Sequence, residues 1–464
     1  MSDHYPTIVI GGTTSGVGKT SVATGLMAAL TTAGYIVQGH KVGPDYIDPS
    51  WHELATGRPR RNLDVMMAGE DQIAPLVKQA MVGADISVIE GVMGLFDGAG
   101  PQDDYASTAH IARLLNAPII LVVDAANVSR SVAATVYGFT HFMGSPGAPL
   151  ARIAGVIANR IGSSKHADLI TQAVESIGVP MLGCLPRVPE LATPSRHLGL
   201  IPVAERTAQA HDTVSGLGAW VAANTDIHRV IEWANRAQLP EGPMWFPGTS
   251  RLNGHEPVTI AVAEGEAFSF QYTENVLALE AAGARLVPFD PTVDRHLPDQ
   301  TEVIWIGGGF PEMHALKLAE NRALIADIQR FADRGGAIVA ECAGLLYLSE
   351  VLDGHKMSGL LPIEAAMSSS LTLGYRRAKA ETDSVLFQAG DQIIGHEFHR
   401  TQLTRLPQGP HAWTLTDPYS GVVTQEGVVS HGGNIHAAYL HTQWIDPSPA
   451  QRLVQCALDK RAQT

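Results

Sequence analysis

The sequence predicts an α/β protein with two domains, the first of them built on a doubly wound parallel sheet. Short apolar runs alternate with helical stretches along the chain, which is typical of parallel sheets covered by helices. Several of these runs end in turns rich in glycine or acidic residues, at the edge where parallel sheets bind ligands. Residues 239–257 are dense in Pro and Gly, so we expect a linker there between domains over 1–238 and 258–460.

A glycine-rich turn carries the chemistry of the first domain. Residues 7–10 predict a buried strand, residues 22–30 predict a helix, and Gly11-Gly12-Thr13-Thr14-Ser15-Gly16-Val17-Gly18-Lys19-Thr20-Ser21 joins them. Backbone N–H groups of such a turn approach phosphate oxygens at a helix N-terminus, which favours anions. Thr13 stands where the strict phosphate-loop pattern has Gly, but the strand-to-helix context favours a phosphate loop over a chance turn. The residues expected to bind ATP are Ser15, Gly16, Val17, Gly18, Lys19, Thr20 and Ser21.

Carboxylates follow the next two predicted strands. Glu90 closes an apolar run, where a buried carboxylate is costly, and this position favours a Mg²⁺ anchor. Asp45 and Asp48 lie in a Gly-Pro turn after the other strand. We expect Thr20, Asp45 and Glu90 to hold Mg²⁺. Asp48 is expected to orient a substrate, although ordinary turn chemistry also explains both aspartates.

Other features of the first half give weaker signals. Asn159, at a strand end, can offer its amide to adenine. Asp97 lies in a Phe-Asp-Gly turn, which is also plain turn chemistry. Three arginines, which form either a solvated face or a clamp for an anionic substrate, are Arg58, Arg60 and Arg61. Strands are predicted at 35–37, 86–89, 118–123, 153–158 and 181–185, and a helix at 131–142.

In the second half a cysteine follows a predicted strand. Residues 337–340 enter Glu341-Cys342-Ala343-Gly344, and a helix follows. Such a sharp turn presents a side chain at the sheet edge, and a helix N-terminus lowers a thiol pKa. We therefore interpret Cys342 as a nucleophile rather than a buried structural cysteine, with His441 as its base. The expected oxyanion donors are the backbone N–H groups of Gly308, Gly309 and Ala343.

The second half also contains His396-Glu397-Phe398-His399, which looks like a metalloprotease motif. It has one residue too few between its histidines to place both on one helical face, and its period-two pattern fits a strand. We interpret it as structural or substrate-facing rather than metal-binding. Further strands are predicted at 258–262, 285–288 and 303–306, and a helix at 272–282.

Composition argues against several classes of function. At ~150 residues per domain, 464 residues suffice for two or three cores. The net charge of −14 and the lack of a basic run argue against nucleic acid as a partner. Three scattered cysteines indicate neither a disulfide framework nor a zinc site, so we expect a cytoplasmic protein. We predict no signal peptide and no membrane span.

Taken in order, the motifs of both halves resemble those of the cobyrinic acid a,c-diamide synthase family over nearly the whole chain. Most class I amidotransferases follow the catalytic His with Pro-Glu, whereas Thr442 and Gln443 follow His441 here. The motifs that carry the resemblance are residues 16–20, 41–46, 61–64, 90–98, 307–312, 341–344, 395–399 and 439–441.

The resemblance implies an N-terminal ATP domain related to dethiobiotin synthetase and a C-terminal class I glutamine amidotransferase domain. It implies that ATP, with Mg²⁺, converts the a and c acetate carboxylates of the corrinoid cobyrinic acid into acyl phosphates. Ammonia from L-glutamine would then form the amides, as a step of cobalamin biosynthesis. The fold family is compatible with a homodimer. The residues implied to position the macrocycle are Tyr46, Asp48, Arg61 and Asp97.

Two alternatives stay open on the sequence. The same chemistry fits hydrogenobyrinic acid, which is the cobalt-free ring, or Ni-sirohydrochlorin. The other alternative is a switch ATPase of the partitioning type with a non-catalytic amidotransferase-like domain. Thr13 and Thr14 argue against it, because they occupy the region where such loops carry an additional lysine. The intact pair of Cys342 and His441 also argues against it.

Overall fold

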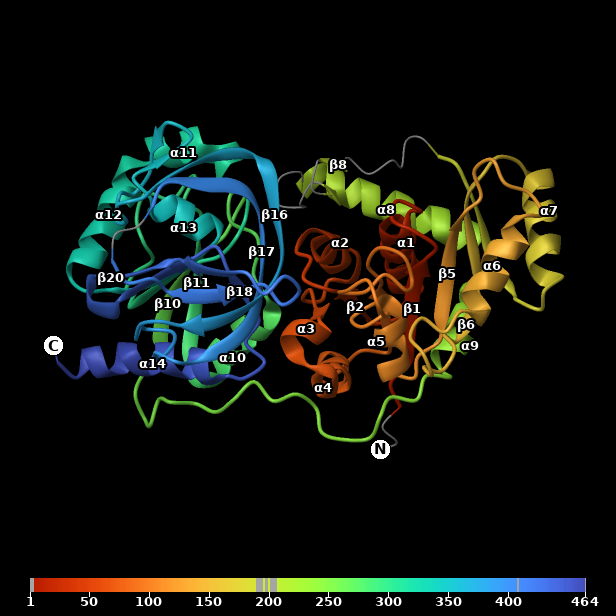
Figure 1. The fold of residues 1–464 in the computed structure, drawn as a ribbon, viewed down its shortest axis with the longest axis horizontal. Coiled ribbons are helices and arrows are strands. Elements are labelled where there is room, and N and C mark those ends of the chain that lie inside the picture. Colours follow the sequence, from red (N-terminus) through yellow and green to blue (C-terminus); the bar gives the residue numbers. More distant parts are fainter. Residues whose placement is uncertain (1–3, 189–194, 197–198, 201–206, 407–408, 464) are drawn as a thin grey trace. The chain divides into compact units, whose positions relative to one another are not determined.

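The computed structural model describes residues 4–188, 195–196, 199–200, 207–406 and 409–463, and it divides into two compact units (Figure 1). The units are Met1–Phe246 and Pro247–Thr464, so the division falls within the stretch 239–257. Each unit has its own sheet and buried core, in agreement with the predicted α/β class. Within the described ranges, every helix is too short or too polar to cross a bilayer.

The first unit contains a seven-stranded parallel sheet in the order β3-β2-β4-β1-β5-β6-β7. Ile8 and Ile10 of its central strand are fully buried, because helices cover the sheet and leave no polar face. The strands are β1 (Thr7–Gly12), β2 (Val37–Val42), β3 (Asn62–Leu63), β4 (Ile86–Glu90), β5 (Ile119–Asp124), β6 (Ile153–Ile161) and β7 (Met181–Pro186), with β8 (Ser195–Arg196) and β9 (Gly199–Leu200) as a separate pair.

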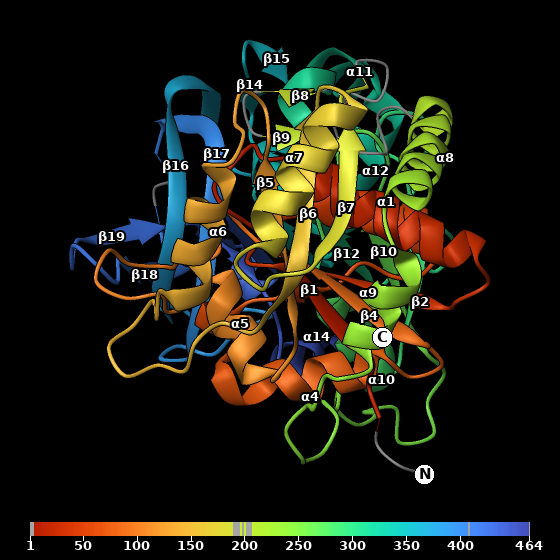
Figure 2. The ribbon, with the colours of Figure 1, turned by 90° about the vertical axis from the view of Figure 1, so that its right-hand side faces the viewer.

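Helices surround this sheet, and α8 packs along α1 in both views (Figures 1 and 2). The helices are α1 (Lys19–Thr32), α2 (Ile47–Thr56), α3 (Val65–Ala68), α4 (Glu70–Ala80), α5 (Thr108–Leu114), α6 (Val132–His141), α7 (Ser164–Glu175), α8 (Thr207–Asn224) and α9 (Ile227–Ala234).

The strand order brings three loops of the first unit to one place. The chain leaves β1 for β2, yet β4 lies between these two strands. In the register of the sheet, Glu90 of β4 is opposite both Ile10 of β1 and Lys41 of β2. The loops that follow β1, β2 and β4 therefore begin side by side at the carboxyl edge, which is where open parallel sheets bind ligands.

The second unit has a six-stranded sheet in the order β11-β10-β12-β13-β21-β20, parallel except for β20. Along β12, Ile304 and Ile306 enter one core while Val303 and Trp305 enter the other. Both faces are covered, which explains the continuous apolar run. The strands are β10 (Val258–Ala263), β11 (Ala284–Phe289), β12 (Val303–Ile306), β13 (Ala337–Glu341), β20 (Val428–Ser430) and β21 (Ile435–Ala438).

The helices of the second unit follow the strands as the sequence pattern indicated. Residues 272–282 were expected to be helical, and α10 covers all but the first of them. The helices are α10 (Thr273–Ala282), α11 (Ala315–Glu320), α12 (Arg322–Asp333), α13 (Ala343–Leu348) and α14 (Ser448–Arg461), with 3₁₀ turns at η3 (Pro311–His314) and η4 (His431–Gly433).

A second sheet in this unit was not predicted beyond the strand pattern at 395–399. Its long strands β16 and β17 pair antiparallel over most of their length (Figure 2). Many of their side chains are exposed or half-buried, so neither strand has a continuous apolar run. The strands are β14 (Val351–Leu352), β15 (His355–Lys356), β16 (Glu364–Ala380), β17 (Gln392–Arg405), β18 (Trp413–Thr416), β19 (Val423–Glu426) and β22 (His441–Thr442).

Candidate active sites

The phosphate loop of the first unit runs from the end of β1 to the start of α1. Gly16 and Gly18 adopt φ angles of 76° and 95°, in the left-handed region that favours glycine. A Cβ atom at Gly18 would also collide with the side-chain amide of Asn159. Thr13 has no left-handed φ, so the position that departs from the strict pattern does not need glycine.

Lys19, expected to meet the terminal phosphates, is held by the loop itself. Its Nζ donates to the carbonyl oxygen of Thr14, at 3.2 Å, and to that of Met93. Burial, followed by repulsion from the Lys41 ammonium, lowers the pKa of Lys19 to about 8. A phosphate oxygen would replace these carbonyls and would favour the charged ammonium.

Polar side chains meet at the carboxyl ends of β2 and β4. The Thr20 Oγ1 lies 2.7 Å from Glu90 Oε1 and 3.2 Å from Asp48 Oδ2. The Lys41 Nζ donates to the same two oxygens, at 2.9 Å and 2.7 Å, and to the Gly91 carbonyl at 3.1 Å. These three acceptors satisfy all three N–H groups of the ammonium. Lys41 lies in the motif 41–46, but the sequence indicated no role for it.

Charge in this cluster is balanced by the Lys41 ammonium. Burial alone would lower the pKa of Lys41, but Asp48 and Glu90 outweigh it and raise that pKa. Burial alone would raise the pKa of Glu90, but Lys41 and His52 outweigh it and lower that pKa. His52 Nε2 lies 2.6 Å from Glu90 Oε2, a contact that no sequence pattern indicated. Burial and the Asp45 carboxylate raise the pKa of Asp48.

The donor set of this cluster fits Mg²⁺. Mg²⁺ is usually held by one or two carboxylates together with substrate phosphates, and Thr20, Asp48 and Glu90 offer such oxygens. Asp45, also predicted to hold Mg²⁺, accepts the Ile47 N–H through Oδ1 at 2.8 Å, and its Oδ2 lies 4.0 Å from Lys41 Nζ at the edge of the cluster. Across the described ranges, no three Asp, Glu, His or Cys side chains are arranged to hold a metal ion by themselves.

Asn159, which was predicted to offer its amide to adenine, contacts the phosphate loop. Its Nδ2 donates to the Val17 carbonyl at 2.9 Å, and its Oδ1 accepts the Arg160 N–H at 2.8 Å. The amide is 7% exposed and braces the phosphate loop. The strand predicted at 153–158 continues to Ile161, so Asn159 lies within β6, and its contact with adenine stays a prediction.

The arginines of residues 58–61 are also engaged within the protein. Arg61 is 5% exposed and donates to the Gln79 side chain, and its predicted contact with the substrate stays a prediction. Arg58 donates to Gln38 Oε1 at 2.9 Å, and Arg60 pairs with a glutamate of α2 at 3.2 Å. These arginines precede the short edge strand β3, and their side chains contact β2, α2 and α4.

The two other residues predicted to meet the substrate lie in loops at the carboxyl edge. Tyr46 is buried and directly precedes α2. Asp97 accepts the Gly94 N–H at 2.7 Å. This is the turn-forming role that the sequence offered as the alternative to substrate binding.

In the second unit, Cys342 sits at a strained turn between β13 and α13. Its φ of 49° and ψ of −97° are rarely adopted by a residue with a side chain, and such strain is typical of functional positions. The Cys342 N–H donates to the Ala438 carbonyl at 2.7 Å. A Cβ atom at Gly344 would collide with the Ile306 carbonyl, which explains a glycine two residues later. Burial, followed by the Glu312 carboxylate, raises the pKa of the thiol.

His441 lies on β22 and is 1% exposed. Its ring stacks on that of His396, with centroids 5.0 Å apart and planes 15° apart, because the two residues are opposite each other on β22 and β17. A Cβ atom at Gly308 would lie 2.5 Å from His441 Cε1, so the ring rests on the 307–309 loop. Burial, followed by repulsion from His396, lowers the pKa of His441 well below its usual value. This shift favours the neutral ring, which is the form that a general base must have before it takes a proton.

The three predicted oxyanion donors differ in what they contact. The Gly308 N–H is engaged elsewhere, because it donates to the Phe270 carbonyl at 3.1 Å. Ala343 is the first residue of α13, where backbone N–H groups lack intrahelical partners, and its N–H lies against the Cys342 thiol. Gly309 follows in the same glycine loop, at a φ of 158°.

Gln443, two positions after His441, is hydrogen-bonded to α10. Gln443 occupies the place of the usual glutamate, and its Nε2 donates to Glu274 Oε2 of α10 at 3.0 Å. Asn275 holds the same segment through the Thr442 carbonyl, at 2.8 Å, and the Trp444 N–H, at 2.7 Å. These contacts could not be read from the sequence, because α10 is about 170 residues away along the chain.

The motif 396–399 lies on β17, as its period-two pattern predicted. His396 Nε2 is 2.8 Å from the Tyr272 hydroxyl, while Glu397 pairs with Arg376 at 2.6 Å. His399 stacks on Tyr439 with ring centroids 3.8 Å apart. The motif thus supports the strand that carries His441.

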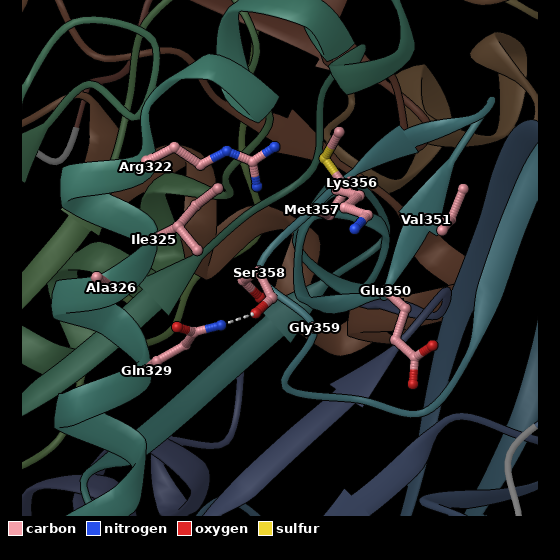
Figure 3. A pocket seen from close by; sticks show the side chains of 10 residues that line it. All are labelled: Arg322, Ile325, Ala326, Gln329, Glu350, Val351, Lys356, Met357, Ser358 and Gly359. Atoms are coloured by element: carbon pink, nitrogen blue, oxygen red, sulfur yellow. Dashed lines mark hydrogen bonds between the residues drawn. The ribbon is translucent and has the colours of Figure 1, made fainter.

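A separate cleft of about 410 Å³ lies in the second unit, and its lining includes neither Cys342 nor His441. Figure 3 shows Arg322 and Gln329 of α12 on one side and Lys356 on the other. Gln329 Nε2 donates to the Ser358 carbonyl at 2.6 Å. We assign no function to this cleft.

Comparison with known protein families also assigns nucleotide binding to the first unit and glutamine amidotransferase chemistry to the second. Residues 8–201 match the CobQ/CobB/MinD/ParA nucleotide-binding domain, and residues 259–448 match the CobB/CobQ-like glutamine amidotransferase domain. The first of these descriptions groups several kinds of nucleotide-binding protein, so on its own it does not separate the two classes weighed in the sequence.

Relatives that match the chain over nearly its full length distinguish the amidating enzyme from the switch ATPase. The chain is 46% identical to the hydrogenobyrinate a,c-diamide synthase of Thermobifida fusca, with 98% of each chain covered. It is 45% identical to the enzyme of the same name from Streptomyces coelicolor, with 97% of each covered. It is 39% identical to the cobyrinate a,c-diamide synthase of a Synechococcus species, with 94% of each covered. The chain therefore belongs to the a,c-diamide synthase family, as its motifs indicated.

Proposed function

We propose that this chain amidates the a and c acetate carboxylates of a corrinoid ring, with ATP and L-glutamine as co-substrates. One observation carries the proposal. A single chain contains a phosphate loop beside an acidic cluster and, in a second unit, a strained cysteine and a buried neutral histidine. The relatives that match this chain over nearly their full length are named a,c-diamide synthases.

In the first unit, the residues are suited to activating a carboxylate. A carboxylate is a poor electrophile for ammonia, whereas an acyl phosphate is a good one. Lys19 and the N–H groups of the loop would hold the ATP phosphates, and Thr20, Asp48 and Glu90 would hold Mg²⁺. When bound, Mg²⁺ would neutralise the negative charge on the phosphate oxygens during phosphoryl transfer. Lys41 keeps Asp48 and Glu90 in place and adds a positive charge beside the transferred group.

In the second unit, the residues are suited to releasing ammonia from glutamine. The Cys342 sulfur attacks the side-chain amide carbon while His441 accepts the thiol proton. The C–N bond then breaks, His441 returns the proton to the leaving ammonia, and water hydrolyses the thioester to glutamate. Backbone N–H groups of Gly309 and Ala343 would stabilise the oxyanion.

The comparisons favour hydrogenobyrinic acid as the ring to test first. The relatives at 45% and 46% identity carry that substrate in their names, and the relative at 39% carries cobyrinate. The two rings differ by the central cobalt, so cobyrinic acid is the second candidate. None of these names supports Ni-sirohydrochlorin.

We also infer a cytoplasmic location, because ATP and glutamine are available there, and a homodimer, which the fold family is compatible with. Sedimentation at two protein concentrations tests the dimer.

Mass spectrometry of each ring after incubation with enzyme, Mg²⁺, ATP and glutamine tests the proposed function. We expect a diamide from the wild-type enzyme. The Cys342→Ser variant should form it only when ammonium salt replaces glutamine. ATP hydrolysis with every ring left unchanged would refute the proposed substrate class.

A further inference from the structure

A side-chain hydrogen bond links the neighbour of the nucleophile to the neighbour of the base. Glu341, the last residue of β13, directly precedes Cys342, and Thr442, the last residue of β22, directly follows His441. Glu341 Oε1 accepts the Thr442 hydroxyl at 2.9 Å and the Thr442 N–H at 3.3 Å. Both residues are at most 5% exposed.

This bond connects two different sheets. β13 pairs with β12 and β21, whereas β22 pairs with β17, and no backbone ladder joins β13 to β22 among the described strands. The chain itself passes from β21 to β22 through the two residues Tyr439 and Leu440. The position of His441 relative to Cys342 therefore depends on this short connection and on side-chain contacts.

The direction of the Thr442 hydroxyl is fixed by a second partner. Trp444 Nε1 donates to Thr442 Oγ1 at 2.9 Å, so the hydroxyl proton is left for Glu341. Asn275 holds the backbone on both sides, as described above. The contact is thus specific in geometry and is not a chance approach of two polar groups.

We propose that Glu341 and Thr442 are positioning residues that set the Cys342 thiol against the His441 ring. The inference rests on the proposed glutaminase roles of Cys342 and His441, and neither positioning residue touches the substrate in this scheme. A carboxyl group beside a nucleophile has an evident cost, since Glu341 is among the charges that raise the pKa of Cys342, after burial and Glu312. A geometric role explains why a hydrogen-bond acceptor stands at position 341 despite this cost.

The proposal distinguishes acceptor geometry from charge. Glu341→Gln keeps an oxygen that accepts both bonds, so glutamine hydrolysis should stay within ~3-fold of wild type. Glu341→Leu removes the acceptor, and Thr442→Val removes the hydroxyl. Each should lower the kcat for glutamine hydrolysis by ~10²-fold, the effect of a shift of about 1 Å in a reacting group. KM for glutamine should change by less than ~2-fold.

Thr442→Ser is the matched control, because it keeps the hydroxyl, and it should restore kcat to within ~3-fold of wild type. The double variant Glu341→Leu with Thr442→Val should lose no more than Glu341→Leu alone, because both changes break the bond between the Thr442 hydroxyl and Glu341. Amidation with ammonium salt should remain at the wild-type rate in all of them, and this also verifies that the variants are folded.

The proposal is overturned if Thr442→Val is folded and hydrolyses glutamine at the wild-type rate. It is also overturned if the losses of the two single variants multiply. If Thr442→Val does not fold, the comparison of Glu341→Gln with Glu341→Leu decides, and equal activity of these two refutes the proposal. Cys342→Ser distinguishes a failure of this proposal from a failure of the proposed function. If that variant still hydrolysed glutamine, the glutaminase role of Cys342 itself would be refuted.

Discussion

Replacing Gly308 with alanine is expected to disable glutamine use while leaving the use of free ammonia intact. The added Cβ atom would lie 2.5 Å from His441 Cε1 and 3.3 Å from Nδ1. Gly308 does not adopt a left-handed φ, so its backbone accepts alanine without strain. The backbone is also fixed by bonds to Phe270 in both directions, at 3.1 Å and 3.0 Å. The added Cβ atom would also lie 3.1 Å from Phe270 Cβ, but its shortest approach is to the His441 ring, so that ring must move the most.

The size of the effect follows from this collision. Carbon atoms in contact lie ~3.5–4.0 Å apart, so the ring must retreat by about 1 Å. The stacked ring of His396 stands behind it, which limits where the ring can go. A displacement of this size costs ~10²-fold in rate, or about 2.7 kcal/mol in the activation free energy. Overpacking should also lower the free energy of unfolding by about 1–3 kcal/mol.

The assay compares kcat with glutamine and kcat with ammonium salt for the same preparation. Gly138→Ala in α6 is a suitable control, because a Cβ atom there meets no atom within 4 Å. Both activities of that control should match the wild type. Wild-type glutamine hydrolysis by Gly308→Ala would refute the reasoning, because it would mean that the base does not act from the position of His441 described here.

Three further predictions concern charge and the phosphate loop. Burial raises the pKa of Glu341 from 4.5 to about 7, so the folded state binds more protons and loses stability as the pH rises from 4.5 to about 7. Glu341→Gln should remove this loss, of about 3 kcal/mol at most, in urea titrations at pH 5 and pH 8. Lys41→Met leaves two buried carboxylates unbalanced and should cost about 3–5 kcal/mol, with MgCl₂ raising the Tm of the variant more than that of the wild type. Asn159→Ala should raise the KM for ATP and for GTP by the same factor, because Asn159 braces the loop; a selective loss of ATP would restore the adenine role.

The features that were predicted correctly are those encoded within a short stretch of sequence. The phosphate loop and the strand–cysteine–helix turn each need only a dozen consecutive residues, because one strand, one turn and one helix define them. The α/β class followed from apolar runs that are buried on both faces. The half-exposed strands β16 and β17 gave no such signal.

Contacts between neighbouring strands could not be predicted from the sequence. Lys41 meets Glu90 because β2 and β4 are neighbours in a register that places these residues opposite each other. Sequence order alone suggests β3 as the neighbour of β2 and gives no reason to place β4 on its other side. The same limit explains Arg61, whose local pattern of positive charge indicated a surface, whereas its strand placed it against Gln79.

Gln443 shows how a local comparison can mislead when the surrounding contacts have changed. Since most class I amidotransferases have glutamate at this position, Gln443→Glu is the obvious repair of a departure from the pattern. Here it would place a second carboxylate beside Glu274, whose Oε2 now accepts from Gln443 Nε2 at 3.0 Å, and both side chains are at most 2% exposed. Two buried carboxylates at this distance repel each other unless one binds a proton. We therefore expect Gln443→Glu to lower the Tm at pH 8 and to recover it at pH 5, with Glu274→Gln in the same chain restoring stability at both values. A rise in glutamine hydrolysis at an unchanged Tm would instead show that Gln443 still stands in the catalytic position of the usual glutamate.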